Sequence, residues 1–593
     1  MSRVATADVH YILRRTFGFS GFRGQQEAVV TRVLAGLPTL ALMPTGAGKS
    51  LCYQLPALAL DGTAIVISPL IALMHDQIRA ADALGIRAAS MTSADADNAA
   101  TAAALKAGEL DLLYVAPERA TTPGFEALLA QAKLSLFAID EAHCVSEWGH
   151  DFRPDYRMLR PLLDRFADVP RLALTATADE VTRADVLRQL GIPDDGLVVA
   201  GFDRPNIRYA IGPRANAGQQ VADFVRRTSG AGIVYANSRA ATERLAEQIA
   251  RTGRPTGFYH AGLPPERRSA VQAEFVASED MVMVATIAFG MGIDKPDVRF
   301  VVHAGLPKSI EAYYQETGRA GRDGDPAEAA LFWSPNDFAR ARQRLSEVEE
   351  HRLPGERARL DALAGLVETP GCRRAILLRH FGEDPPASCG NCDNCENPPR
   401  LVDATELARK LLSAVYRTGQ SFGMGHIEKV LLGRADERVT SREHDRLSVF
   451  GIVGEEEAPL LRPLVRSLTA HGMLTTTDHG GLALGPAARP VLKGERPVTI
   501  AEPPAKKRSR ARTQAANPVG DPLFDALRAK RKALASERGV PAYVIFHDSV
   551  LRDMARERPE TLRELGELQG VGATKLETYG ADFIAVIRDS FRA

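Results

Sequence analysis

A glycine-rich string near the start of the chain has the residue types that hold phosphate groups. Met43-Pro-Thr-Gly-Ala-Gly-Lys-Ser50 follows an apolar run of strand length and precedes a run of helical length. In this setting glycines let backbone N–H groups close around phosphate oxygens, and the helix N-terminus adds positive potential. Met43 stands where the usual pattern has its first glycine, and a chance glycine-rich turn is the alternative. The expected nucleotide contacts are Thr45, Gly46, Gly48, Lys49 on the β- and γ-phosphates, and Ser50 on Mg²⁺.

A second string, Asp140-Glu-Ala-His143, ends the apolar run Leu134–Ile139. Its carboxylates therefore emerge at the carboxyl end of a strand, where open α/β sheets bind ligands. Asp140 is expected to hold Mg²⁺, and Glu141 to polarise the attacking water as general base. An acidic helix cap is the alternative, and the upstream phosphate-binding string argues against it. The two strings together predict hydrolysis of a nucleoside triphosphate.

These residues need parallel sheets to position them. From about residue 37 to 300, strand-sized apolar runs alternate with amphipathic stretches, which is typical of doubly wound domains. A break near 201–205 predicts two such domains in tandem. Examples of the expected strands are Thr39–Met43, Ala64–Ser68, Leu112–Val115, Leu134–Ile139, Arg171–Leu174, Gly232–Tyr235, Met281–Ala285 and Phe300–His303.

Composition limits the class of protein. A chain of 593 residues with 45% hydrophobic and 25% charged residues predicts several globular domains. Lys+Arg and Asp+Glu both number 74, so any contact with nucleic acid must come from local patches. We expect an intracellular protein without a membrane partner, because the start lacks a signal-peptide core and no apolar run approaches the roughly 20 residues that cross a bilayer.

Four of the six cysteines are clustered, with the spacing C-x16-C-x2-C-x2-C. This spacing predicts a tetrahedral zinc site, and a structural one, because four thiolates leave no open position. A redox Cys-x-x-Cys is the alternative, and it lacks the βαβ setting that it needs. Cys52 and Cys144 are interpreted as core residues. The expected zinc ligands are Cys372, Cys389, Cys392 and Cys395.

From about Phe17 to Phe583 the sequence resembles the superfamily-two helicases, and within them the RecQ family of ATP-dependent DNA helicases, bacterial type with one HRDC domain. The resemblance implies an α/β fold of two tandem RecA-like parallel-sheet domains, then a helical zinc-binding module, a winged-helix domain and a small all-α HRDC bundle. The implied boundaries are 1–204 and 205–335 for the RecA-like domains, 336–401 for the zinc module, 402–489 for the winged helix, 490–518 for a flexible linker and 519–593 for the HRDC domain.

The resemblance also assigns residues to ATP. In the string from Phe17 to Gln26, Phe19 would stack on adenine, Gln26 would read its edge and Arg23 would lie nearby. Gly24-Gln25 stands where the family usually has Pro-Gly, so Gln26 is preferred over Gln25 only by its position in the motif. The string Gln315-Glu-Thr-Gly-Arg319-Ala-Gly-Arg322 would supply Gln315 and two arginine fingers, which lie on one helix face if the segment is helical. Salt bridges on a solvated helix are the alternative for the two arginines.

The string Ser146–Tyr156 resembles the family's aromatic-rich loop. Trp148 and Phe152 offer faces on which bases stack, and Arg153 could meet phosphates; core packing is the alternative for the two rings. The hairpin 474–484 would be the wing of the winged helix, with His479 near its tip as a wedge or as an ordinary turn histidine. The other expected DNA contacts are Ser68, His150 and His260.

The predicted activity is unwinding of duplex DNA that depends on ATP and Mg²⁺. The resemblance implies 3′→5′ movement on single-stranded DNA, and roles in recombination, repair and the SOS response to DNA damage. It also implies a place in the bacterial cytosol at the nucleoid, with single-strand-binding protein and other repair proteins as candidate partners. Two alternatives stay open: an RNA-dependent ATPase or helicase on the same motor, and a scaffold with a vestigial motor, which the intact Lys49, Asp140 and Glu141 argue against.

Overall fold

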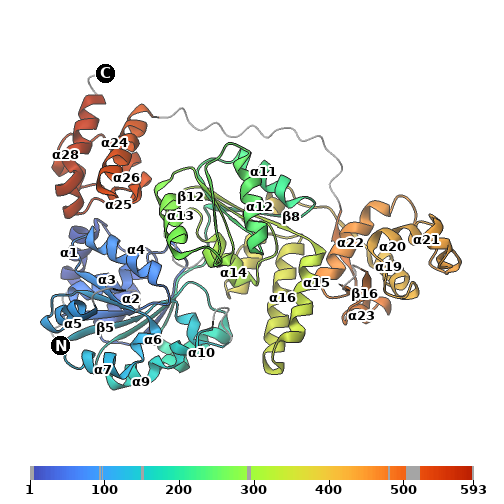
Figure 1. Ribbon diagram of the computed structural model, residues 1–593, viewed down its shortest axis with the longest axis horizontal. Coiled ribbons are helices and arrows are strands. Elements are labelled where there is room, and N and C mark those ends of the chain that lie inside the picture. The colour runs from blue at the N-terminus through green and yellow to red at the C-terminus, as the bar shows by residue number, and fades with distance from the viewer. Residues whose placement is uncertain are drawn as a thin grey trace.

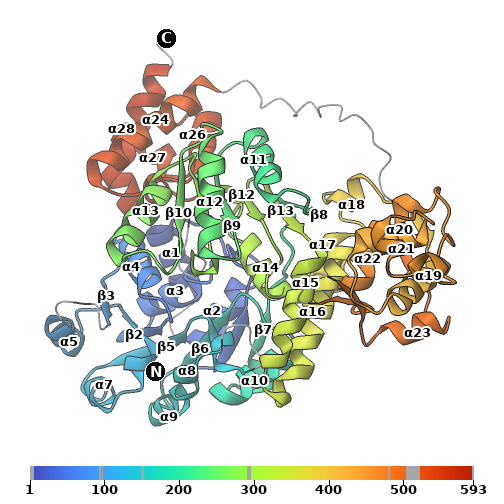
Figure 2. The same cartoon turned by 45° about the vertical axis from the view of Figure 1, so that its right-hand side comes forward.

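The computed structural model describes residues 6–92, 95, 98–147, 152–289, 295–477, 481–502 and 521–590. Figure 1 shows two sheet-containing lobes, a helical module beside the second lobe, and a small mixed domain at the far end of the molecule. The helices that end the chain lie against the two lobes (Figures 1 and 2). The predicted fold class is confirmed: two parallel-sheet lobes, a zinc module, a winged helix and a helical bundle.

The first lobe is built on a parallel sheet of β1 Thr39–Leu42, β2 Thr63–Ile67, β3 Ala88–Met91, β4 Leu112–Val115, β5 Leu134–Ile139, β6 Arg171–Thr175 and β7 Leu197–Val199. Their order is β3-β4-β2-β5-β6-β1-β7. Leu40 and Leu42 join one apolar cluster and Ala41 joins another, so β1 is covered on both faces. That double burial explains the uninterrupted apolar runs in the sequence. The helices are α1 Thr6–Phe17, α2 Gln26–Leu34, α3 Leu51–Ala59, α4 Ile71–Asp82, α5 Asn98–Ala107, α6 Pro117–Ala120, α7 Pro123–Leu129, α8 Pro154–Arg157, α9 Leu159–Arg165 and α10 Glu180–Leu190.

The second lobe repeats this plan with β8 Ile207–Pro213, β9 Ala231–Tyr235, β10 Thr256–Tyr259, β11 Val282–Ala285, β12 Val298–His303 and β13 Ala327–Trp333. All neighbours pair in parallel, in the order β10-β11-β9-β12-β13-β8. The connector from β7 to β8 is the hinge between the lobes, and Phe202 in it stacks on Phe381 with ring centroids 4.7 Å apart. The helices are α11 Ala217–Arg227, α12 Arg239–Ala250, α13 Pro265–Ala277 and α14 Ile310–Thr317.

The zinc module follows, with α15 Pro335–Arg344, α16 Leu353–Glu368, α17 Arg373–His380 and α18 Asp393–Glu396. The winged-helix domain packs on it, and Arg466 Nε donates to Glu368 Oε1 at 2.8 Å across their boundary. The predicted wing is a two-stranded hairpin of β15 and β16. The elements of this domain are β14 Leu401–Asp403, α19 Thr405–Arg417, α20 Met424–Leu431, α21 Glu437–Thr440, α22 Ala458–Ala470, β15 Leu474–Thr476, β16 Leu482–Leu484, α23 Ala488–Leu492 and β17 Thr499–Ala501.

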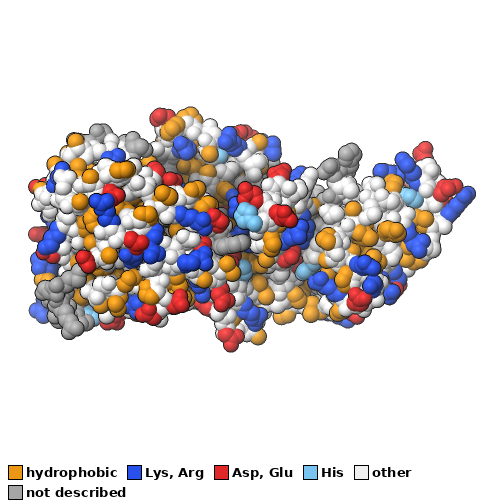
Figure 3. All heavy atoms as spheres, turned by 90° about the horizontal axis from the view of Figure 1, so that it is seen from below, with side chains coloured by type: hydrophobic (Ala, Val, Ile, Leu, Met, Phe, Trp, Pro, Cys, Tyr) orange, Lys and Arg blue, Asp and Glu red, His pale blue; other side chains and the backbone are white. Residues whose placement is uncertain are grey.

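The C-terminal bundle consists of α24 Pro522–Arg538, α25 Ala542–Ile545, α26 Asp548–Glu557, α27 Leu562–Gly566 and α28 Ala573–Ser590. Its own apolar core includes Phe546, Leu551 and Phe583. On the face of the molecule seen in Figure 3, basic and acidic side chains are interspersed, in keeping with the balanced composition. None of the helices in the described part of the chain combines the length and apolar character needed to cross a bilayer.

Candidate active site and zinc centre

A cavity of about 250 Å³ lies between the two lobes. It sits at the carboxyl ends of β5, β6 and β1, which are neighbours in the first sheet, so the loops that follow these strands converge on it. Both phosphate-binding and acidic strings reach it from the first lobe, and the arginine string reaches it from the second. Its lining residues include Thr45, Gly46, Gly48, Lys49, Ser50, Tyr53, Gln77, Asp140, Glu141, Gln315, Arg319, Arg322 and His547.

The phosphate-binding loop has a conformation that requires glycine. Gly48 has φ +75°, and a Cβ built on it would lie 2.5 Å from Gln26 Nε2. That amide donates to Ala47 O at 2.9 Å, which ties α2 to the loop. Lys49 Nζ lies 3.3 Å from Met43 O. The loop is therefore held by its own backbone and by α2, with Lys49 in the cavity wall.

The residues expected around adenine lie next to this loop. The Arg23 guanidinium carbon lies 5.8 Å from the centre of the Phe19 ring. The Arg23 backbone N–H donates to Gln26 Oε1 at 2.9 Å. Gln26 is buried and faces the loop, whereas Gln25 is exposed. The structure thus places Gln26, and not Gln25, beside the phosphate-binding loop.

The acidic string begins at the end of β5. Glu141 has φ +47°, a left-handed conformation that turns the chain sharply after the strand. His143 is buried, and its Nδ1 lies 3.3 Å from Glu141 Oε2 and 2.9 Å from Thr175 Oγ1 at the end of β6. This chain of contacts connects Glu141 to the Thr175-Ala-Thr177 segment, which runs on toward α10.

Burial and the neighbouring Glu141 carboxylate raise the pKa of Asp140 and Lys49 lowers it, so that the resulting pKa is about 7. A cation beside this buried carboxyl would favour its charged form, and Ser50 lines the same cavity. Carboxylate and hydroxyl oxygens are the donors that Mg²⁺ prefers, so the residues fit this ion. When bound, it neutralises charge on the phosphate oxygens.

The arginines reach the cavity from the second lobe, but they do not lie on a helix, so the condition under which they would share one helix face is not met. Helix α14 ends at Thr317, and both arginines lie in the turn that follows, where Gly321 has φ +57°. Arg319 is only 5% exposed, and its Nε has no hydrogen-bond partner among the described residues. A Cβ on Gly46 would lie 3.5 Å from Arg322 Cα, so the turn abuts the phosphate-binding loop.

The residues expected to contact DNA lie in different environments. Arg153 NH1 donates to Pro69 O at 3.1 Å, which joins the aromatic-rich segment to the segment at Ser68. Phe152 lies under the Arg157 guanidinium, 5.3 Å from its carbon. Ser68 and His260 are buried, and His260 Nε2 lies 3.0 Å from Glu243 Oε1. The remaining residues of this set lie outside the described part of the chain: Trp148, His150 and His479.

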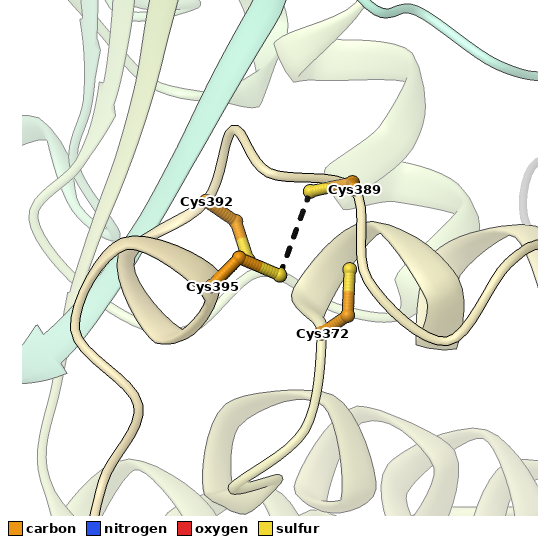
Figure 4. A group of neighbouring side chains, drawn as sticks. All are labelled: Cys372, Cys389, Cys392 and Cys395. Atoms are coloured by element: carbon orange, nitrogen blue, oxygen red, sulfur yellow. Dashed lines mark hydrogen bonds between the residues drawn. The ribbon is translucent and has the colours of Figure 1, made fainter.

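The four clustered cysteines form the zinc centre (Figure 4). Their Sγ atoms all lie within 4.8 Å of one another, and the Sγ atoms of Cys389 and Cys395 are 3.9 Å apart. Zn–S bonds of about 2.3 Å in a tetrahedron place sulfurs about 3.8 Å apart, so the cluster fits zinc. Cys52 and Cys144 are fully buried elsewhere, as expected of core residues.

The zinc centre fixes the module to the second lobe. Asp393, between two of the cysteines, accepts the backbone N–H of Ile211 in β8 at 2.9 Å. Arg374, two residues after Cys372, donates to Ile207 O at 2.7 Å. Loss of the metal should therefore loosen both the module and the edge of the second sheet.

We expect Cys392→Ala to lose zinc and to become poorly soluble, because the metal contributes directly to the folding free energy. Metal content by mass spectrometry should fall from about one zinc per chain to none. Asp384→Ala, an exposed change in the same loop, is the matched control and should keep its zinc. A soluble, zinc-free and active Cys392→Ala protein would contradict this account.

The C-terminal bundle docks on both lobes. The Gly570 N–H donates to Gly18 O at 2.6 Å, and a Cβ on Gly18 would lie 2.6 Å from the backbone nitrogen of Gly572. On the second lobe, Arg531 NH2 lies 3.2 Å from Glu279 Oε1, and Arg552 NH1 lies 2.7 Å from Asp325 Oδ1. The loop 570–572 thus packs against the N-terminal segment at Gly18, while His547 lines the nucleotide cavity.

Asp325→Arg is expected to weaken this docking, and Arg552→Asp in the same chain to restore it, because the pair then has its charges exchanged. A partly exposed ion pair is worth up to about 1 kcal/mol, or roughly fivefold in the docking equilibrium. Hydrogen exchange of the Gly570 amide should quicken accordingly. Arg556→Asp, on the same helix but directed to Asp553, is the control. Equal exchange rates of the Gly570 amide in the wild type, Asp325→Arg, the double variant and Arg556→Asp would exclude a docking role for the pair.

Several residues of the cavity were missed from the sequence. Tyr53 and Gln77 lie on helices α3 and α4, and their side chains are 3.4 Å apart at the cavity wall. His547 comes from the last domain of the chain. Arg204 does not line the cavity but contacts the phosphate-binding loop at Thr45 O; it lies in the string 201–205, where the sequence indicates only a domain break. Nothing in the spacing between that string and the other motifs indicates that Arg204 contacts the phosphate-binding loop.

Fold and site define a two-lobed nucleotide-hydrolysing motor of the helicase type. The chain matches the family models described as DEAD/DEAH box helicase at 23–185, helicase conserved C-terminal domain at 218–324, RecQ zinc-binding at 335–396, RQC domain at 398–509 and HRDC domain at 521–587. It belongs to the RecQ family of helicases.

Three relatives carry the name ATP-dependent DNA helicase RecQ. The protein of Pasteurella multocida is 42% identical over 97% of this chain and 93% of its own length. The protein of Haemophilus influenzae is 42% identical over 98% of this chain and 95% of its own length. The protein of Bacillus subtilis is 38% identical over 97% of this chain and 98% of its own length. The likeness therefore extends over every domain of the chain.

Proposed function

We propose that this protein separates the strands of duplex DNA by ATP-driven stepping along one strand. One observation carries the proposal: Lys49 and Glu141 of the first lobe and Arg319 of the second line a single cavity. A nucleotide in that cavity would touch both lobes, so that binding draws the lobes together and hydrolysis releases them. Each cycle then moves the lobes relative to a bound strand.

Within the cavity each residue has a distinct task. Lys49 and the loop N–H groups bind the phosphates, and Ser50 and Asp140 would hold Mg²⁺. Glu141 orients the attacking water and accepts its proton, helped by the contact with His143 that fixes its side chain. Arg319 and Arg322 stabilise the charge that grows in the transition state, and Gln315 lines the cavity beside them. Phe19, Arg23 and Gln26 bind the adenine.

The DNA track is proposed to run over Ser68, Phe152 and Arg153 on the first lobe and past His260 on the second. Arg153 and Pro69 are in contact, so a strand bound there would touch the segment that leads back to Glu141. Trp148 and His150 belong to the same loop by sequence, and His479 to the wing. Because phosphate contacts dominate such binding, affinity should fall steeply with salt.

The finer assignments rest on family membership. We propose 3′→5′ movement, work in recombination and repair, including the SOS response, and action in the bacterial cytosol at the nucleoid. Single-strand-binding protein is the proposed protein partner, since the enzyme produces the single strands that such a protein covers. The domain limits given above are proposed as the units of the chain.

Strand separation and nucleic-acid preference test the proposal together. We expect ATP hydrolysis to be stimulated by single-stranded DNA far more than by RNA of the same sequence. We also expect displacement of a strand from a duplex with a 3′ tail and not from one with a 5′ tail. Stronger stimulation by RNA would favour the RNA helicase alternative, and ATP hydrolysis without any displacement would refute the unwinding activity.

A further inference from the structure

Arg204, in the hinge between the lobes, joins two segments of the nucleotide cavity. Its NH1 donates to Thr45 O at 2.7 Å in the phosphate-binding loop and to Gly318 O at 3.1 Å. Its NH2 donates to Ala320 O at 2.9 Å and to Gly321 O at 2.8 Å. One guanidinium thus contacts the loop of the first lobe and the arginine turn of the second.

The acceptors are all backbone carbonyls. Gly318, Ala320 and Gly321 follow the end of α14, where carbonyl groups carry negative partial charge. Gly321 O also accepts from the backbone N–H of Gly324 at 3.1 Å and from Asn206 Nδ2 at 2.8 Å. A cation is favourable there, and the planar fork of arginine matches several acceptors at once. Across the described residues, no carboxylate lies within ion-pair distance of Arg204, and the adjacent Asp203 pairs with Arg374 at 3.4 Å.

The carbonyls that Arg204 holds surround the catalytic arginines. Gly318 and Ala320 flank Arg319, and Gly321 precedes Arg322. The turn is close to the opposite lobe, because a Cβ on Gly318 would lie 3.5 Å from Thr45 Cβ and one on Gly46 would lie 3.6 Å from Arg204 NH1. A change in the backbone of this turn would therefore move the guanidinium of Arg319 relative to the phosphates.

We propose that Arg204 is a positioning residue for ATP hydrolysis, which sets the arginine turn against the phosphate-binding loop. The inference rests on the proposed function, since it assumes hydrolysis in this cavity. Three of its four hydrogen bonds stay within the turn of the second lobe, and the fourth crosses to Thr45. Separation of the lobes breaks only the crossing bond, so the turn keeps its shape and re-forms the contact when the lobes close.

A positioning role predicts a specific split of kinetic constants. Arg204→Lys keeps the charge but loses the fork, and Arg204→Ala loses both. We expect kcat for ATP hydrolysis to fall by about 10- to 100-fold in both, the scale of a misplacement of about 1 Å, while KM for ATP changes less than about threefold. Arg251→Ala, an exposed arginine of the second lobe, is the control and should leave both constants unchanged.

The decisive arm is a double-mutant cycle with Arg319→Ala, measured in single turnover. If Arg204 acts through Arg319, adding Arg204→Lys to Arg319→Ala changes the hydrolysis rate by less than about threefold. Fully additive losses, or a wild-type kcat in Arg204→Lys and Arg204→Ala, would overturn the inference. A wild-type protein that fails to hydrolyse ATP would instead overturn the proposed function. Arg204→Lys keeps the positive charge of the hinge. A melting temperature equal to that of the wild type would show that its slower hydrolysis is a kinetic effect and not a folding defect.

Discussion

Arg319→Ala is expected to slow ATP hydrolysis by about 10³-fold or more while ATP still binds. Arginine fingers contribute about 10³ to 10⁵ to kcat in phosphoryl transfer because they meet charge that develops only in the transition state. Arg319 suits this role because it is buried in the cavity wall and its Nε has no hydrogen-bond partner among the described residues. A phosphate oxygen would give that group an acceptor.

The measurement is single-turnover hydrolysis together with the affinity for a fluorescent ATP analogue. Arg251→Ala controls for the loss of an arginine elsewhere on the second lobe. If Arg319→Ala lost ATP affinity and rate to the same extent, the residue would bind the ground state and not the transition state. A rate within threefold of wild type would remove Arg319 from the chemistry.

Glu141→Gln is expected to lower kcat by about 10² to 10⁴, the range for loss of a general base. The amide keeps the size of the side chain and its proximity to His143, but it does not accept the proton of the attacking water. ATP affinity should be unchanged, so the variant should hold ATP between the lobes. Mixing experiments that follow phosphate release would measure this.

The control for Glu141→Gln is Glu109→Gln, an exposed change on the same lobe. Phosphate release at the wild-type rate in Glu141→Gln would assign the base to another group. The DNA-stimulated rate should be lost in equal measure, because DNA acts on the same hydrolytic step. If Glu141→Gln lost only the DNA-stimulated part of the ATP hydrolysis rate and kept the basal rate, Glu141 would transmit DNA binding to the site and would not be the general base.

The strands named from the sequence are all internal members of the two sheets, although the internal strand β13 was not among them. Strands β3, β7, β8 and β10 are the outermost members of the two sheets, and none was named. An edge strand has one neighbour and stays partly exposed, so it lacks the uninterrupted apolar run that marks a strand buried on both faces. The residues of β3, Ala-Ala-Ser-Met, are mostly half-buried. Pattern alone therefore could not separate them from loop.

The same limit applies to the site. Residues within one short string, such as Gly48 and Lys49, are placed by the strand and helix on either side and could be predicted. His547 reaches the cavity from the last domain, whereas Arg204 contacts the phosphate-binding loop at Thr45 from the hinge; both positions depend on how whole domains pack. The sequence also left open whether α14 continues to Arg319, because Gly318 and Gly321 allow either a helix or a turn.

The distance between the lobes during turnover tests the central claim most directly. Fluorophores attached through unnatural amino acids at the exposed positions Glu109 and Arg251 would avoid the zinc cysteines. We predict that energy transfer changes when ATP binds to the Glu141→Gln form on single-stranded DNA, and that it oscillates in the unsubstituted protein at the rate of ATP hydrolysis. Energy transfer that stays constant while ATP is consumed would contradict a motor driven by closure of the two lobes.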